Sequence, residues 1–150
     1  MSVIADILNG LATLLAAGTF SLTVTPVRSW FVSYDVSELE ALKVTVTPKT
    51  TERSIISRRT SEQTVDYYIA LQQKARDIDD LDAEMVPLLT LAQEYHDYLF
   101  TNRQLMLPDG SRALYAGSVQ DVIYDVPTLM AKGVITSLMT VSYRYYGSSG

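Results

Sequence analysis

The stretch VDYYIALQQKARDIDDLDAEMVPLLTLAQEYHDYLFTN, residues 65–102, decides the fold class because the period of its apolar residues changes within it. Its first part alternates apolar and more polar residues, as a β-strand with one buried face does: Val65, Tyr67, Ile69 and Leu71. From residue 79 to about residue 102 the apolar residues recur every three or four positions, which predicts an amphipathic helix. Pro87 interrupts that pattern, so either the regular helix begins near Pro87 or an early turn is kinked there.

The segments around this stretch extend the same pattern. Residues 3–17 have the apolar spacing of a second helix, and residues 20–25, 43–47 and 135–145 alternate as strands do. Residues 49–54, which follow a proline, are polar and predict a loop or hairpin tip. The order predicts an α+β fold, in which a mostly antiparallel sheet carries an N-terminal helix and one long helix packed on one face.

A chain of 150 residues is long enough for one hydrophobic core. We therefore expect a single domain over residues 1–146 and a flexible tail over residues 147–150. Residues 3–17 are the most apolar stretch, but they contain Asp6 and Asn9 and fall short of the roughly 20 residues that cross a bilayer. No association with a membrane is expected.

Composition excludes several classes of function. The chain has no cysteine and one histidine, which excludes disulfides, thiolate zinc sites, iron–sulfur clusters and multi-histidine metal sites. It has 12 basic and 17 acidic residues, a net charge of −5, whereas dedicated nucleic-acid binders carry a basic excess. We expect neither a metal nor another cofactor.

The candidates for catalysis are weak. His96 lies just off the apolar stripe of the long helix, and no serine or cysteine is close to it in the sequence. The acidic run from Asp77 to Glu84 lacks the turn glycine of a calcium loop, and its twelfth position is Leu88. Acidic residues at a helix start stabilise the helix dipole, which accounts for the run more simply. We therefore expect no enzyme.

The charges, in contrast, are segregated along the chain. Residues 43–76 hold seven basic residues against three acidic ones, and residues 77–84 hold five acidic residues and no basic one. Complementary surfaces of this kind suit contacts between subunits, and tyrosine is a frequent interface residue. The candidate interface residues are Arg53, Arg58, Arg59, Asp77, Asp79, Asp80, Asp82, Glu84, Tyr143 and Tyr145.

The order of segments over residues 42–100 and 134–146 resembles that of the tail-terminator and neck proteins of tailed bacteriophages. The shared pattern is a β-hairpin, a basic or polar turn (Ser57-Arg58-Arg59-Thr60) and a strand that ends in a polar run (Leu71-Gln72-Gln73-Lys74). An acidic linker (77–82), a long amphipathic helix and a late strand (134–145) follow.

This resemblance implies a structural virion protein that forms a ring, typically a hexamer, at the head-proximal end of the tail. Such a ring ends growth of the tail tube and joins the tail to the head–tail connector and neck proteins. The implied location is the tail–neck region of the virion, and the host cytoplasm during assembly. Arginines that face the lumen of the ring would touch passing DNA weakly and without sequence preference.

A ring requires two different patches that fit each other. We expect these to be the hairpin around Arg53, Arg58 and Arg59 and the acidic residues from Asp77 to Glu84. Three alternatives stay open: a head-completion adaptor or a tube-like subunit of the same virion, a monomeric α+β binding domain with a ligand cleft at Trp30, and an enzyme.

Overall fold

The computed structural model describes residues 2–31, 39, 41–76 and 79–148, and its elements form one six-stranded sheet with three helices. The helices are α1 (Val3–Ala17), α2 (Asp82–Thr101) and α3 (Val126–Lys132). The strands are β1 (Val27–Arg28), β2 (Lys43–Ile55), β3 (Thr60–Lys74), β4 (Gln104–Met106), β5 (Arg112–Val122) and β6 (Val134–Ser148).

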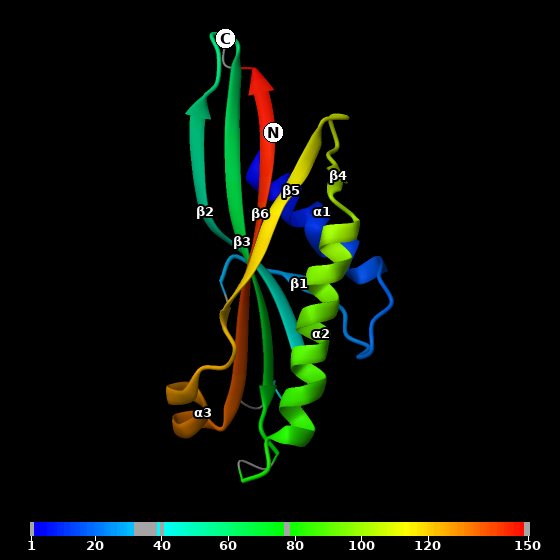
Figure 1. Ribbon diagram of the computed structural model, residues 1–150, viewed down its shortest axis with the longest axis vertical. Helices are drawn as coiled ribbons and strands as arrows, with labels where there is room; N and C mark the ends of the chain where they lie inside the picture. The colour runs from blue at the N-terminus through cyan, green and yellow to red at the C-terminus, as the bar shows by residue number, and fades with distance from the viewer. Residues whose placement is uncertain (1, 32–38, 40, 77–78, 149–150) are drawn as a thin grey trace.

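The strand order is β1-β2-β3-β6-β5-β4, and all pairs are antiparallel except β1 with β2. β3 and β6 pair over 15 residues each and run along almost the whole length of the molecule (Figure 1). The predicted α+β class and mostly antiparallel sheet are confirmed. The helices number three rather than two, and α1 with 15 residues is not much shorter than α2 with 20.

One face of the sheet carries the core and is covered by α1 and α2. The alternating residues of β3 that were expected to be buried, from Val65 to Leu71, are at most 1% exposed. They pack with the apolar stripes of the two helices, and the Tyr67 hydroxyl donates to the Ile4 carbonyl of α1 at 2.7 Å. The opposite face, which we call the open face, is more polar.

The helix ends follow capping chemistry only in part. The Ser2 hydroxyl accepts from Ala5 N at the start of α1, and Gly133 ends α3 in the left-handed conformation at φ 67°. α2 begins at Asp82, so Pro87 lies inside the helix and the alternative in which the helix begins near Pro87 is wrong. A proline this early removes one intrahelical donor.

The structure corrects two predicted boundaries, the end of strand β2 and the start of the C-terminal tail. β2 does not end at Pro48: it continues to Ile55 through a bulge between Pro48 and Thr50, so the predicted loop at 49–54 is strand. β6 reaches Ser148, so Gly147 and Ser148 belong to the sheet and not to a flexible tail.

The predicted strand at 20–25 is absent, because this segment is irregular in the structure. Phe20 packs edge-on against Tyr95 and Tyr98 of α2, and Ser21 N donates to Glu94 at 2.9 Å. Packing against a helix has replaced strand pairing here. β5, which the sequence did not predict, completes the far side of the sheet.

Candidate functional site

The basic turn joins β2 to β3 at one end of the molecule. Residues 56–59 form the turn, which is closed by bonds from Ile56 N and Ser57 N to the Thr60 carbonyl at 3.0 and 3.1 Å. Every residue from Thr51 to Arg59 is exposed, including the apolar Ile55 at 78% and Ile56 at 55%. This hairpin therefore presents apolar and cationic side chains to the solvent together.

The three arginines predicted for an interface all belong to this hairpin. Arg58 and Arg59 lie in the turn, and Arg53 lies on β2, where its guanidinium donates to the Gln63 side chain at 3.4 Å. On the open face nearby, Arg144 pairs with Glu62 at 3.3 Å. Arg53 thus contacts a neighbouring strand of its own subunit, and Arg58 and Arg59 lie farther along the hairpin, in the turn.

The acidic residues lie at the opposite end of the molecule. Asp77 is outside the described residues; Asp79 and Asp80 precede α2, and Asp82 and Glu84 are in its first turn. Glu84 has a local role, because its carboxylate accepts from Arg76 N at 2.6 Å. Asp79, Asp80 and Asp82 are exposed near the N-terminus of α2, the positive end of the helix dipole.

The structure does not bring the two charged groups together within one subunit. The hairpin and the start of α2 lie at opposite ends of β3 (Figure 1). Fifteen residues at roughly 3.3 Å per residue separate them by about 50 Å. The predicted contact between them is therefore possible only between different copies of the chain.

The two tyrosines in the predicted interface differ in exposure. Tyr143 is fully buried, and its ring packs against Tyr115 with centroids 6.1 Å apart. Its prediction as an interface residue is corrected: it belongs to the core of the subunit. Tyr145 is half-buried beside that core, and the neighbouring Tyr146 is 46% exposed.

His96 has a serine neighbour that its sequence context did not reveal. Its Nδ1 lies 2.5 Å from Ser118 Oγ, and its Nε2 lies 3.5 Å from Gln120 Oε1, both on β5. The Tyr115 hydroxyl is 2.7 Å from the same serine oxygen. The bonds are all satisfied if Tyr115 donates to Ser118, Ser118 to Nδ1, and Nε2–H to Gln120.

This arrangement serves packing better than nucleophilic catalysis. The two N–H groups of the Gln120 amide are shared among three acceptors, the Val122 carbonyl, the Ser137 hydroxyl and the Leu138 carbonyl, which fixes the far end of the chain of bonds. In a Ser-His-Asp triad a carboxylate accepts from the second ring nitrogen of the histidine, whereas at His96 an amide oxygen occupies that position. The network ties α2 to β5.

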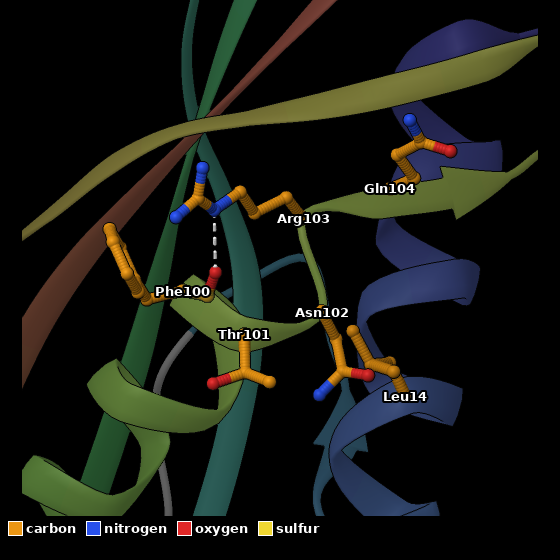
Figure 2. Close-up of a pocket in the computed structure, with 6 residues that line it drawn as sticks. All are labelled: Leu14, Phe100, Thr101, Asn102, Arg103 and Gln104. Carbon is orange, nitrogen blue, oxygen red and sulfur yellow. Dashed lines mark hydrogen bonds between the residues drawn. The ribbon is translucent and has the colours of Figure 1, made fainter.

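A depression of about 680 Å³ lies between the C-terminal end of α2 and α1. It is lined by Leu14 and residues 100–104 (Figure 2). Arg103 is the charged residue that lines it. Its Nε donates to the Phe100 carbonyl at 2.8 Å, and its guanidinium lies 4.2 Å from the Phe100 ring centre. The arginine is therefore engaged with its own neighbours.

A second depression, of about 450 Å³, lies on the open face of the sheet. Residues of β2, β3, β6 and the start of α3 line it, and they come from four separate parts of the sequence: Thr47, Pro48, Lys49, Tyr68, Gln72, Asp125, Thr128, Thr136 and Leu138. We call it the open-face pocket.

A β-bulge positions the lysine of this pocket. Pro48 pairs with Tyr67 and Thr50 with Asp66, so Lys49 is the extra residue of the bulge. Its Nζ lies 4.9 Å from the centre of the Tyr68 ring and donates to Thr140 Oγ1 at 3.3 Å. The Thr140 hydroxyl in turn donates to Asp121, which is the extra residue of a bulge in β5.

Metal and membrane sites can be assessed over the described ranges. Within them, no group of three or more histidine, aspartate and glutamate side chains is arranged to hold a metal ion. In the same part of the chain, no helix combines the length and apolar character that crossing a bilayer requires.

A comparison with models of protein families finds none that matches this chain, and a search of curated proteins finds no match either.

Proposed function

We propose that this chain is a structural subunit of a tailed-bacteriophage virion that forms a ring at the head-proximal end of the tail. The ring ends growth of the tail tube and joins the tail to the head–tail connector and neck proteins. It is assembled in the host cytoplasm and resides in the tail–neck region. The proposal rests on the resemblance of segment order and on three features of the subunit.

The observation that carries the proposal is the placement of the hairpin. Ile55, Ile56, Arg58 and Arg59 project at one end of the long axis, and Asp79, Asp80 and Asp82 lie exposed at the other. Subunits that contact each other head to tail bring these two ends together. Repetition of such a contact between different patches generates a closed ring if the rotation between subunits closes.

The edges of the sheet offer a second route for contact between subunits. Within the described ranges, β1 pairs only with Thr45 and Val46 of β2, and β4 pairs only with residues 112–114 of β5. Beyond these pairs, Ser29 N donates to the Val46 carbonyl at 2.9 Å and Tyr115 N to the Arg103 carbonyl at 2.7 Å. Residues 50–55 of β2 and residues 116–122 of β5 thus each have an edge without a partner strand in the described ranges, on opposite sides of the sheet. Pro48 and the bulge beside it restrict further pairing on β2 to residues 50–55.

A weak contact with DNA is a secondary part of the proposal. If the hairpins border the lumen, a hairpin arginine that does not contact the neighbouring subunit lies near passing phosphates and neutralises part of their charge. The net charge of −5 keeps such contact weak, which suits DNA that must move through the ring.

The test is the mass of the protein in solution, measured by light scattering over a concentration series and followed by electron microscopy. A single ring-sized species is expected. Reversal of the hairpin charges by Arg58→Glu with Arg59→Glu should give monomers, whereas Arg112→Glu on β5 should not. A variant that keeps Arg59 and combines Arg58→Glu with Asp80→Arg and Asp82→Arg should assemble again.

Each alternative predicts a different result. Tubes of increasing length would favour a tube subunit over a terminator. A monomer that forms no ring at any concentration, and none on purified tail tubes, would overturn the proposal. That result would favour a monomeric binding domain, for which the exposed Trp30 (61%) and Phe31 (68%) beside Arg28 are the supporting feature.

A further inference from the structure

The open-face pocket has two buried acceptors that lack a donor. Thr47 is 6% exposed and Gln72 is 9% exposed, and both line the pocket. Within the described part of the chain, neither Thr47 Oγ1 nor Gln72 Oε1 has a hydrogen-bond partner. The Gln72 amide nitrogen donates to Thr136 Oγ1 at 3.5 Å, which fixes the carbonyl oxygen as the free end. A buried acceptor without a donor costs about 1–3 kcal/mol.

The charges of the pocket favour a cation. The charge of Lys49 is compensated through Thr140 by Asp121 at one end of the pocket. At the other end Asp125 accepts from the Thr128 hydroxyl at 2.5 Å, and no basic side chain of the described residues forms an ion pair with it. The occupant that these groups fit carries positive charge at the Asp125 end and several N–H donors.

A guanidinium group meets both requirements. It has five N–H donors in one plane and stays charged at any ordinary pH, whereas an ammonium group is a compact point charge with three donors. Its planar form also suits the floor of a sheet, where the acceptors of neighbouring strands lie side by side. Pro48 and Leu138 offer apolar contact for an arginine stem.

We propose that the open-face pocket binds the guanidinium of Arg59 from a second copy of this chain. This proposal deepens the proposed function and rests on it. Arg59 is exposed in the hairpin turn, and the turn is stiffened because Ser57 Oγ accepts from Arg59 N at 3.4 Å and from Thr60 N at 3.2 Å. The pocket includes Gln72, two residues from the end of β3 that leads to the acidic residues.

The same contact joins apolar surfaces. Ile55 and Ile56 beside the arginines are exposed, and so are Val126 (50%) and Met130 (71%) on α3 next to the pocket. A hairpin that inserts Arg59 thus has apolar area to bury against α3. Both the charge and the apolar character of the hairpin are matched by one region of the neighbouring subunit.

The first experiment tests the chemistry of the pocket on dilute, monomeric protein by NMR titration. The probe is N-acetyl-arginine amide, and the control is N-acetyl-citrulline amide, which has nearly the same shape but no charge. We expect saturable shifts at residues of the open-face pocket and at least tenfold weaker binding of the citrulline compound. Equal binding of both compounds, or no saturable binding, would overturn the proposal.

A matched pair of variants then locates the probe. Thr47→Val removes an unpartnered hydroxyl without changing the shape, so the protein should be as stable as before or slightly more stable. The same change should weaken binding of the arginine compound several-fold. Thr64→Val, on the same face of the sheet but toward the hairpin, should leave binding unchanged. Unchanged binding in Thr47→Val would place the probe elsewhere and contradict the assignment.

The second experiment identifies the source of the arginine. Because the chain has no cysteine, Ile56→Cys protein, which keeps Arg59, can be mixed with Met130→Cys protein under mild oxidation and the disulfides mapped by mass spectrometry. We expect a 56–130 link between copies, and none when Gln93→Cys on α2 replaces Met130→Cys. Rings that form without the 56–130 link would overturn the docking and leave the ring standing, whereas a chain that never assembles would overturn both.

Discussion

Lys49 and Asp121 reach the same hydroxyl, that of Thr140, from strands on opposite sides of β6. Lys49 donates to Thr140 Oγ1 at 3.3 Å across β3, and the Thr140 hydroxyl donates to Asp121 on the adjacent β5. Both charged residues are the extra residues of β-bulges, which turn a side chain away from the regular alternation. Two local irregularities thus cooperate to tie four strands together.

Replacing Thr140 by valine tests this link. Thr140 is 8% exposed, and Thr140→Val leaves Lys49 and Asp121 without their shared partner. Because both charges stay hydrated, we expect a loss of about 1 kcal/mol in the free energy of unfolding, measured with urea. Thr140→Ser keeps the hydroxyl and should cost less. A valine variant as stable as the original would show that the link contributes nothing.

A comparison of two buried tyrosines separates the free energy contributed by a hydroxyl's hydrogen bond from that contributed by burial of the ring. Tyr67 and Tyr143 are both 0% exposed; the Tyr67 hydroxyl donates to Ile4 O, and the Tyr143 hydroxyl has no partner within the described ranges. Tyr67→Phe should lose about 1 kcal/mol in urea unfolding, and Tyr143→Phe should be neutral or stabilising. Equal losses in the two variants would contradict this assignment.

The buried tyrosines also set the response to alkali. Burial raises the pKa of Tyr67, Tyr95 and Tyr143 above the ordinary value of 10. The unfolded chain therefore loses these protons first, so the contribution of the three tyrosines to stability is constant below about pH 10 and is lost as the pH rises beyond it. With three such groups the free energy of unfolding should fall by up to about 4 kcal/mol per pH unit. Urea unfolding at a series of alkaline pH values measures this slope. The tyrosinate absorbance of the three buried tyrosines should appear only when the protein unfolds.

Two glycines should respond in opposite directions to alanine. A Cβ at Gly133 has open space around it, but φ 67° is strained for alanine, so Gly133→Ala should cost about 1 kcal/mol. Gly10 lies inside α1, and a Cβ there would contact Leu105 Cδ1 at an ordinary 3.7 Å. Gly10→Ala should gain roughly 0.5–1 kcal/mol. Thermal unfolding measures both, and shifts of the same sign would contradict the reasoning.

The exposed isoleucines should matter for assembly and not for folding. Ile55→Asn with Ile56→Asn removes apolar side chains that are 78% and 55% exposed. The free energy of unfolding should therefore change by less than about 0.5 kcal/mol per site. The concentration at which larger species appear in light scattering should rise several-fold. Met106→Asn, at 61% exposure on β4, is the matched control and should leave the concentration for assembly unchanged. A double variant that assembles as before would exclude these side chains from the contact.

The sequence predicted the elements whose apolar residues keep the same period from end to end. β3 and α2 were predicted from alternation and from a 3.6-residue stripe, and both are present with their apolar residues buried. β5 was missed because bulges shift its register between Tyr115 and Gly117 and between Gln120 and Val122. Each extra residue moves the apolar pattern to the other face, so alternation over the whole strand is lost.

The sites were harder to predict because they join distant segments. Ser118 comes within hydrogen-bond distance of His96 only after strands far apart in the sequence pair. The same pairing brings Thr47, Gln72 and Asp125 to one pocket. Tyr143 was misjudged because alternation reports two faces of a strand without saying which one the helices cover. The charged segments were visible in the sequence, but that they lie at opposite ends of the subunit follows from the 15-residue length of β3.

The position of β6 has a consequence for synthesis on the ribosome. β6 lies between β3 and β5, although it follows both in the chain. The nascent polypeptide can form the β2–β3 hairpin early, but β4 and β5 have no place in the sheet until residues 134–148 leave the exit tunnel. Folding of this region therefore waits for β6, and the long-range pairing makes it slow. Until then, the inner edges of β3 and β5 are open to chaperones and to other nascent chains.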